Sequence, residues 1–89
     1  MKKIKKFEEF QVNERLKLDV EFVLREIVRF NNDEFDIYEL SERILKHLQY
    51  RVNPRNIEIV TDHLLMSADE DTDKIPVDKH LAYELIDLL

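Results

Sequence analysis

The stretch that decides the fold is FDIYELSERILKHLQYRVNPRNIEIVTDHLLM, residues 35–66. It contains two helix-start signals. Asp36 and Glu39 have the spacing of a capping box, in which each side chain can accept a hydrogen bond from the other residue's amide. Asn53 and Pro54 combine a good N-cap with the residue best suited to the first helical position. Two helices joined by a short corner are therefore predicted, from Asp36 to about Tyr50 and from Pro54 to about Ala68.

Apolar residues recur at the spacing of amphipathic helices both inside and outside this stretch. Outside it, the pattern predicts a helix from about Asn13 to Phe30 and another from about Asp78, a possible N-cap, to Leu89. The residues expected on the buried faces are Leu16, Val20, Val23, Leu24, Ile27, Phe30, Ile37, Leu40, Ile44, Leu45, Leu48, Ile57, Val60, Leu64, Leu65, Leu81, Ala82, Leu85, Ile86 and Leu89. The prediction is an all-α fold: a single domain over residues 1–89, built as a small four-helix orthogonal or irregular bundle with a helix-turn-helix-like corner.

Residues 1–12 form a predicted N-terminal basic arm, which carries Lys2, Lys3, Lys5 and Lys6. A short extended arm, a frayed helix and a disordered tail all fit its weak alternation of apolar and polar residues. One interpretation has its apolar residues docked on the core, as termini often are. The other has a basic, aromatic arm that contacts phosphate or lipid.

Residues 67–77 form a predicted acidic loop, and the run from Asp69 to Asp73 matches the opening of an EF-hand calcium loop. The sixth position of that motif requires a sharp turn and is normally glycine, whereas the twelfth supplies a bidentate glutamate. Here these positions hold Lys74 and His80. We therefore predict a solvated loop with no dedicated metal site, and weak divalent-ion binding remains the alternative.

The composition excludes several classes of function. The 89 residues carry a formal net charge of −6 and contain neither cysteine nor glycine. Without glycine, phosphate-binding loops, Rossmann turns and nucleophile elbows are excluded. The three histidines, His47, His63 and His80, have no spacing typical of a zinc site. We predict no cofactor, no metal, no catalytic residue and no membrane span, and hence a non-enzymatic protein of the cytoplasm.

Apolar residues that fall off the buried stripes predict how such a protein acts. Leu18 and Phe22 lie opposite the stripe of their helix, where either a neighbouring segment covers them or they form an exposed anchor. In the third helix Ile59 and Met66 also point away from the core. The sequence thus predicts an adaptor or regulatory module that binds another protein or a second copy of itself. The candidate partner-binding residues are Leu18, Phe22, Arg25, Arg29, Ile59, His63 and Met66.

The helix-turn-helix-like corner supports an alternative function, that of a DNA-binding transcriptional regulator. The helix that begins at Pro54 would then enter the major groove. Glu58 and Asp62 on the same helix would repel phosphate, and no basic hairpin follows it. The candidate DNA-binding residues under this alternative are Arg55, Asn56, Ile59 and His63.

Overall fold

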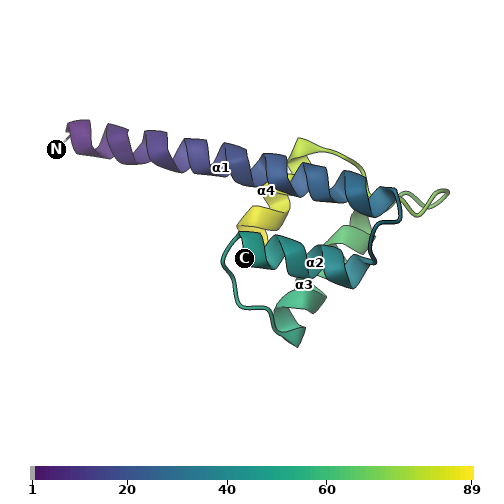
Figure 1. Ribbon diagram of the computed structural model, residues 1–89. Coiled ribbons are helices and arrows are strands. Elements are labelled where there is room, and N and C mark those ends of the chain that lie inside the picture. The colour runs from purple at the N-terminus through teal and green to yellow at the C-terminus, as the bar shows by residue number, and fades with distance from the viewer. Residues whose placement is uncertain (1) are drawn as a thin grey trace.

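The computed structural model describes the backbone of residues 2–89 and the side chains of residues 14–89. Within this range the chain forms helices and no strands, so the predicted all-α four-helix fold is confirmed (Figure 1). The helices are α1 (Lys2–Asn31), α2 (Ile37–His47), α3 (Pro54–Ser67) and α4 (Lys79–Leu88).

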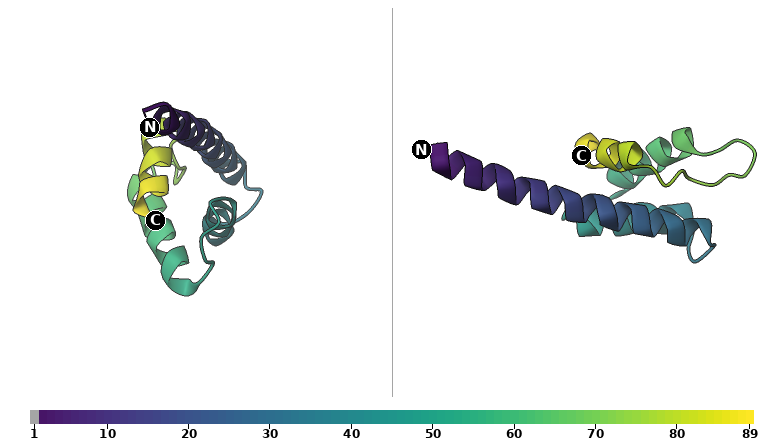
Figure 2. Two further views of the ribbon diagram at one scale, coloured as in Figure 1. Left: turned by 90° about the vertical axis from the view of Figure 1, so that its left-hand side faces the viewer. Right: turned by 90° about the horizontal axis from the view of Figure 1, so that it is seen from above.

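The four helices form a ring in which each helix packs against two others. The helix α1 contacts α2 and α4, and α3 contacts the same two helices from the other side. The ring is seen end-on in the left view of Figure 2. Its interior is filled by apolar side chains from all four helices and from the loop before α4. These core residues are Val20, Val23, Ile27, Leu40, Ile44, Leu45, Val60, Leu64, Ile75, Leu81, Ala82 and Leu85.

The predicted starts of α2, α3 and α4 are confirmed by side chains that cap the first turn. The Asp36 carboxylate accepts a hydrogen bond from the backbone N–H of Glu39 at 2.8 Å. Asn53 and Asp78 likewise cap α3 and α4 through their side-chain oxygens. Only half of the capping box forms, because the Glu39 carboxylate turns towards Arg43, 3.7 Å from its Nε.

The helices α1 and α2 both end in a Schellman motif, with Asp33 and Gln49 in the left-handed backbone region. The Asp33 N–H donates to the Phe30 carbonyl at 2.9 Å, and the Glu34 N–H donates to the Arg29 carbonyl at 3.2 Å. This pair of bonds satisfies carbonyls that the end of a helix would leave unpaired. The motif around Gln49 is equivalent, with bonds from Gln49 to Lys46 and from Tyr50 to Leu45.

Two predicted helix boundaries were wrong. The helix α2 ends at His47 rather than at about Tyr50, because Gln49 adopts φ of 64° and reverses the chain. The backbone of α1 is helical from Lys2 rather than from about Asn13. The sequence there also fits a helix, because Ile4, Phe7 and Phe10 recur every three positions. The predicted basic arm, residues 1–12, lies outside the residues whose side chains are described.

The interface between α2 and α3 contains a buried pair of hydroxyl groups. Ser41 Oγ donates to the Ile37 carbonyl at 3.1 Å, one turn earlier in the same helix, as serine side chains inside helices often do. The same hydroxyl lies 2.8 Å from Thr61 Oγ1. Because both side chains are small, α2 and α3 approach each other closely along this line.

One residue predicted to be buried is exposed. Leu65 retains 54% of its surface, whereas its neighbour Leu64 is fully buried. The helix α3 packs through the narrow line of Val60, Thr61 and Leu64, and Leu65 lies beside this line. Its side chain therefore lines a surface hollow instead of the core.

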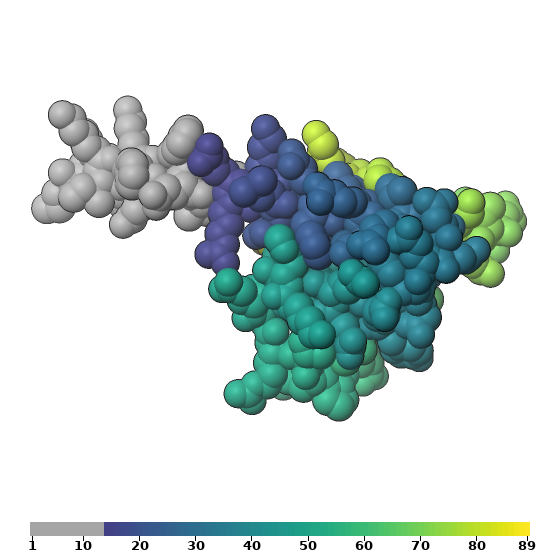
Figure 3. All heavy atoms as spheres, viewed as in Figure 1, coloured from purple at the N-terminus to yellow at the C-terminus, as the bar shows by residue number. Residues whose placement is uncertain are grey.

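The acidic loop is tied to α1 by one asparagine. Asn31 donates through Nδ2 to the Ile75 carbonyl at 2.8 Å and accepts from the Ile75 N–H at 3.0 Å. The Ile75 side chain is buried, with 2% of its surface exposed. The end of the loop is thus part of the core, while its tip extends past the C-terminal end of α1 (Figure 3).

Candidate functional site

The predicted anchors Leu18 and Phe22 lie in different environments on α1. Leu18 keeps 62% of its surface exposed. Phe22 is half-buried, and its ring stacks on the imidazole of His47, with centroids 3.8 Å apart and planes inclined by 5°. His47 in turn lies 3.0 Å from the Asp19 carboxylate. Phe22 therefore contributes to the packing of α1 on α2, and Leu18 is the one of the two that is open to contact.

The two arginines beside these anchors also differ. Arg25 is exposed. Arg29 contacts the carboxylates of Glu34 and Glu26, the second at 3.2 Å. Its hydrogen bond to Glu34 raises the pKa of Arg29 above the ordinary value, because the bond favours the charged guanidinium. Arg29 is thus held at the end of α1 by its own neighbours.

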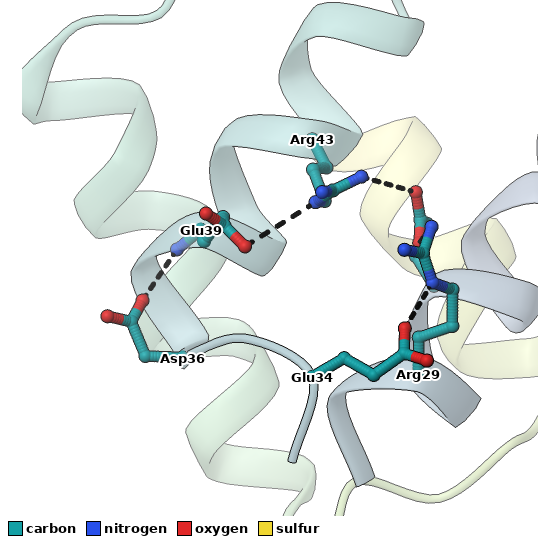
Figure 4. Close-up of polar contacts among 6 residues, drawn as sticks. Arg29, Glu34, Asp36, Glu39 and Arg43 are labelled. Carbon is teal, nitrogen blue, oxygen red and sulfur yellow. Dashed lines mark hydrogen bonds and ion pairs between the residues drawn. The ribbon is translucent and has the colours of Figure 1, made fainter. Parts of the chain in front are cut away.

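Glu26 is a buried charged residue that the sequence analysis did not single out. Only 3% of it is exposed, and its carboxylate lies 3.2 Å from Arg29 Nη1 and 3.4 Å from Arg43 Nη1. Both guanidinium groups also lie over the Phe35 ring, with Arg43 Cζ 4.6 Å and Arg29 Cζ 5.5 Å from its centroid. Figure 4 shows this network of charges between the end of α1 and the start of α2. The burial of Glu26 could have been predicted from the sequence, because this residue lies on the same helical stripe as the apolar residues Val23 and Ile27.

The predicted contact residues of α3 do not form one exposed patch. His63 Nε2 lies 2.8 Å from the Glu84 carboxylate of α4, so its imidazole links two helices. Ile59 is half-buried. Among residues 14–89, Met66 is the most exposed large apolar residue, at 84%.

The candidate DNA-binding residues include one that braces the corner before α3. Asn56 donates through Nδ2 to the Arg51 carbonyl at 2.7 Å, and its backbone N–H donates to the Asn53 side chain. Arg55 is exposed and is the only lysine or arginine in α3. Glu58 and Asp62, both exposed, follow it along the same helix.

The acidic loop is closed by its own hydrogen bonds. The Asp69 N–H donates to the Lys74 carbonyl at 2.9 Å, and the Asp73 N–H donates to the Asp69 carbonyl at 2.8 Å. The Asp69 carboxylate accepts from the Asp71 N–H at 2.8 Å. In the described part of the chain, no three or more histidine, aspartate or glutamate side chains are grouped so as to hold a metal ion.

An apolar hollow of about 580 Å³ opens where the ends of α1 and α3 meet the start of α2. Apolar side chains make up most of its walls, and three aspartates line the rest. The apolar lining residues are Phe30, Phe35, Ile37, Leu65, Ala68 and Ile75, and the acidic ones are Asp33, Asp36 and Asp73.

A second hollow, of about 480 Å³, lies between α2 and the beginning of α3. It shares Leu65 with the first hollow, and the exposed ring of Tyr38 forms part of its wall. We call the two hollows together the α2–α3 groove. The remaining residues that line the second hollow are Pro54, Ile57, Glu58, Thr61 and Asp62.

The charges along the α2–α3 groove all have one sign. The charged side chains that line it are Asp33, Asp36, Asp73, Glu58 and Asp62, and no lysine or arginine is among its lining residues. The nearest contrasting charge on the loop, Lys74, lines a small adjacent hollow with Asp33 and Asp73. The groove is therefore an apolar surface with an acidic rim.

Two exposed residues define this groove: Leu65, which was predicted to be buried, and Tyr38, for which no role was predicted. The run of three apolar residues Leu64, Leu65 and Met66 was the available signal, because one helical stripe cannot bury all three. The exposure of Tyr38 could be predicted in a similar way, because Tyr38 follows Ile37 at the start of α2 and lies off the core-facing stripe.

Comparisons of the chain with protein families, with curated proteins and with solved structures found no match. A membrane-spanning segment would need a long apolar helix, and none of the described helices meets that requirement. Inferences about function therefore depend on the chemistry of the surfaces described above.

Proposed function

We propose that this protein is a non-enzymatic interaction module of the cytoplasm, which binds another protein through the α2–α3 groove. The observation that supports this is the exposure of Tyr38 and Leu65, at 63% and 54%, on the walls of adjoining apolar hollows. Apolar patches with polar rims are typical of protein-binding surfaces, and aromatic residues are frequent among the contacts that dominate binding energy.

Burial of these side chains by a partner would supply part of the binding energy. Complete burial of a leucine contributes about 1.5–3 kcal/mol, so covering the exposed half of Leu65 contributes on the order of 1 kcal/mol. A partner side chain that enters the 580 Å³ hollow would also contact Phe35 and Ile37. The groove can thus recognise two or more apolar side chains on one short segment.

The charged groups support a binding role over catalysis. Glu26 is the one buried carboxylate among residues 14–89, and Arg29 and Arg43 hold it. The carboxylates around the α2–α3 groove are exposed on its rim. A general acid or base needs a carboxyl group whose environment shifts its proton affinity.

Affinity capture with three variants tests the proposal and separates the candidate surfaces. Leu65→Asp places a charge in the α2–α3 groove, whereas Met66→Asp and Leu18→Asp place one on the two surfaces predicted from sequence. All three residues are exposed, so the variants should fold. With the full chain immobilised in a lysate of its native host, we expect Leu65→Asp to lose the specifically retained protein and the other two variants to keep it. Loss only with Met66→Asp or Leu18→Asp would move the binding site to that surface.

DNA binding remains the second candidate, and the exposed Arg55 at the start of α3 is the observation that favours it. That function predicts retardation of duplex DNA that weakens steeply with salt and is lost with Arg55→Ala. A chain that fails to retard DNA even at low salt would not be a DNA-binding regulator. We favour the protein-binding function because Glu58 and Asp62 accompany the single arginine of α3.

A further inference from the structure

We infer that the α2–α3 groove is occupied by the N-terminal segment, residues 2–10, of a second copy of this chain. This inference rests on the proposed function, because it names the occupant of the same groove. The protein would then associate with itself, because the lysine-rich segment of one copy and the aspartate-lined groove of the other have opposite charges.

The acidic rim selects the charge of the occupant. Asp33, Asp36 and Asp73 line the larger hollow together with six apolar residues, and no basic residue lines it. An acidic segment would be repelled there, whereas a segment that alternates lysines with apolar side chains satisfies both the rim and the walls. Such complementarity also gives the association a dependence on ionic strength.

The chain contains one segment with this chemistry. Lysines occupy four of the five positions from Lys2 to Lys6, with Ile4 between them. Phe7 and Phe10 follow, on either side of Glu8 and Glu9, so the segment keeps a net charge of +2 from four lysines and two glutamates. No other part of the sequence concentrates lysine in this way, and the remainder of the chain is acidic. The lysines can pair with the aspartates of the rim while the apolar residues enter the hollow.

The segment cannot reach the groove of its own chain. They lie at opposite ends of α1: the segment begins the helix, whereas the hollow is lined by Phe30 in its last turn and by Asp33 just after it. A helix of this length spans about 45 Å, at a rise of 1.5 Å per residue. Figures 1 and 2 show the same separation between the N-terminus and the loop beyond α1. The occupant must therefore come from a second copy.

A two-fold symmetric dimer satisfies both copies at once. When two α1 helices run antiparallel, each N-terminal segment lies near the C-terminal end of the other α1, beside its groove. Each copy then gives one segment and receives one, which closes the assembly as a dimer. A non-reciprocal arrangement would leave one segment and one groove free and would continue as a chain of copies.

Sedimentation velocity on the full chain tests this inference. The rim variant carries Asp33→Asn, Asp36→Asn and Asp73→Asn, which remove the three carboxylates that line the larger hollow. The local structure is kept, because asparagine tolerates left-handed backbone and caps helices well. The matched control is Glu21→Gln, Asp71→Asn and Asp87→Asn, which removes three exposed charges outside the groove. The third variant replaces Lys2, Lys3, Lys5 and Lys6 with glutamine.

We expect the wild type and the matched control to form dimers, and both the rim variant and the lysine variant to weaken dimerisation at least tenfold. Combining the rim and lysine substitutions should weaken it little further than either set alone, because both remove the same contacts. Circular dichroism should show that all variants keep their helices.

A wild type that stays monomeric at its highest soluble concentration would overturn the inference, and so would a dimer that the rim variant leaves intact. These failures are distinct from failure of the proposed function. If the wild type is monomeric but Leu65→Asp still abolishes capture of a different protein, the groove is a binding site with another occupant. If Leu65→Asp changes neither capture nor self-association, the proposed function is wrong as well.

Discussion

Single residues in unfavourable backbone conformations limit the stability of this chain. Asp33, Gln49 and Asp73 have φ of 63°, 64° and 58°, in the left-handed region where glycine is the favoured residue. Because the sequence contains no glycine, side chains with a Cβ occupy all three positions. Aspartate tolerates this conformation better than glutamine does, so the strain is largest at Gln49.

Gln49→Gly should therefore raise the free energy of unfolding by about 1 kcal/mol. The Schellman bonds from Gln49 and Tyr50 use only backbone groups, so the substitution keeps them. Urea denaturation followed by circular dichroism measures the effect. Gln49→Ala is the control, since it removes the same side chain but retains the Cβ, and it should bring no gain. An equal gain from alanine would show that the side chain, not the backbone, is the source of strain.

Glu26→Ala should lower the free energy of unfolding by about 2 kcal/mol, because it leaves Arg29 and Arg43 without their shared buried partner. The two arginines are only partly buried and can turn towards water, which keeps the loss below that of a fully buried pair. Glu26→Leu, which fills the same space with apolar atoms, should cost less than Glu26→Ala. Thermal and urea unfolding of both variants would show this order. A larger loss with leucine would mean that the charge itself, and not the filled volume, holds α1 against α2.

At the scale of whole elements, the sequence predicts the helix starts that carry a capping side chain, and it misplaces the start of α1 and the end of α2. The starts depend on local side chains, and Asp36, Asn53 and Asp78 each cap a helix as predicted. The end of α2 depends on a left-handed Gln49, which has no compositional signature. The exposure of Leu65 depends on how α3 approaches α2, which only the packed structure reveals. This is also why the α2–α3 groove was not predicted.

The connection between α3 and α4 depends on a contact that is remote in sequence. Asn31 and Ile75 are 44 residues apart, and no local pattern indicates their pairing. Asn31→Ala removes both hydrogen bonds of its side chain and should lower the free energy of unfolding by about 1–2 kcal/mol. Amide hydrogen exchange at Ile75 should accelerate more than exchange in the core of α2, because the loop opens separately from the helices.

Asn32→Ala is the matched control for this prediction, since its side chain is exposed. It should leave exchange at Ile75 unchanged. Slow exchange at Ile75 in the Asn31→Ala variant would mean that burial of the isoleucine side chain alone anchors the loop.

For the molecule as a whole, the α2–α3 groove should behave as one apolar surface. An uncharged dye that fluoresces when it binds exposed apolar surface can report on this groove without repulsion by its acidic rim. Tyr38→Ser with Leu65→Ser should reduce this fluorescence without changing stability by more than about 0.5 kcal/mol, because both residues are exposed. Leu18→Ser with Tyr83→Ser, a pair of similar exposure on α1 and α4, should leave it unchanged. Equal losses of fluorescence from both pairs would mean that the dye binds at scattered exposed residues and not in one groove.

The contact between α1 and α4 has a consequence for synthesis on the ribosome. Three core residues, Leu81, Ala82 and Leu85, belong to α4, and the ring of helices is open on that side until α4 is added. While α4 is still inside the exit tunnel, the apolar face of α1 that α4 later covers is exposed on the nascent chain, where chaperones and proteases can reach it. Completion of the tertiary structure is therefore delayed until after translation of α4, and a stalled or prematurely terminated product should be cleared rapidly by cellular quality control.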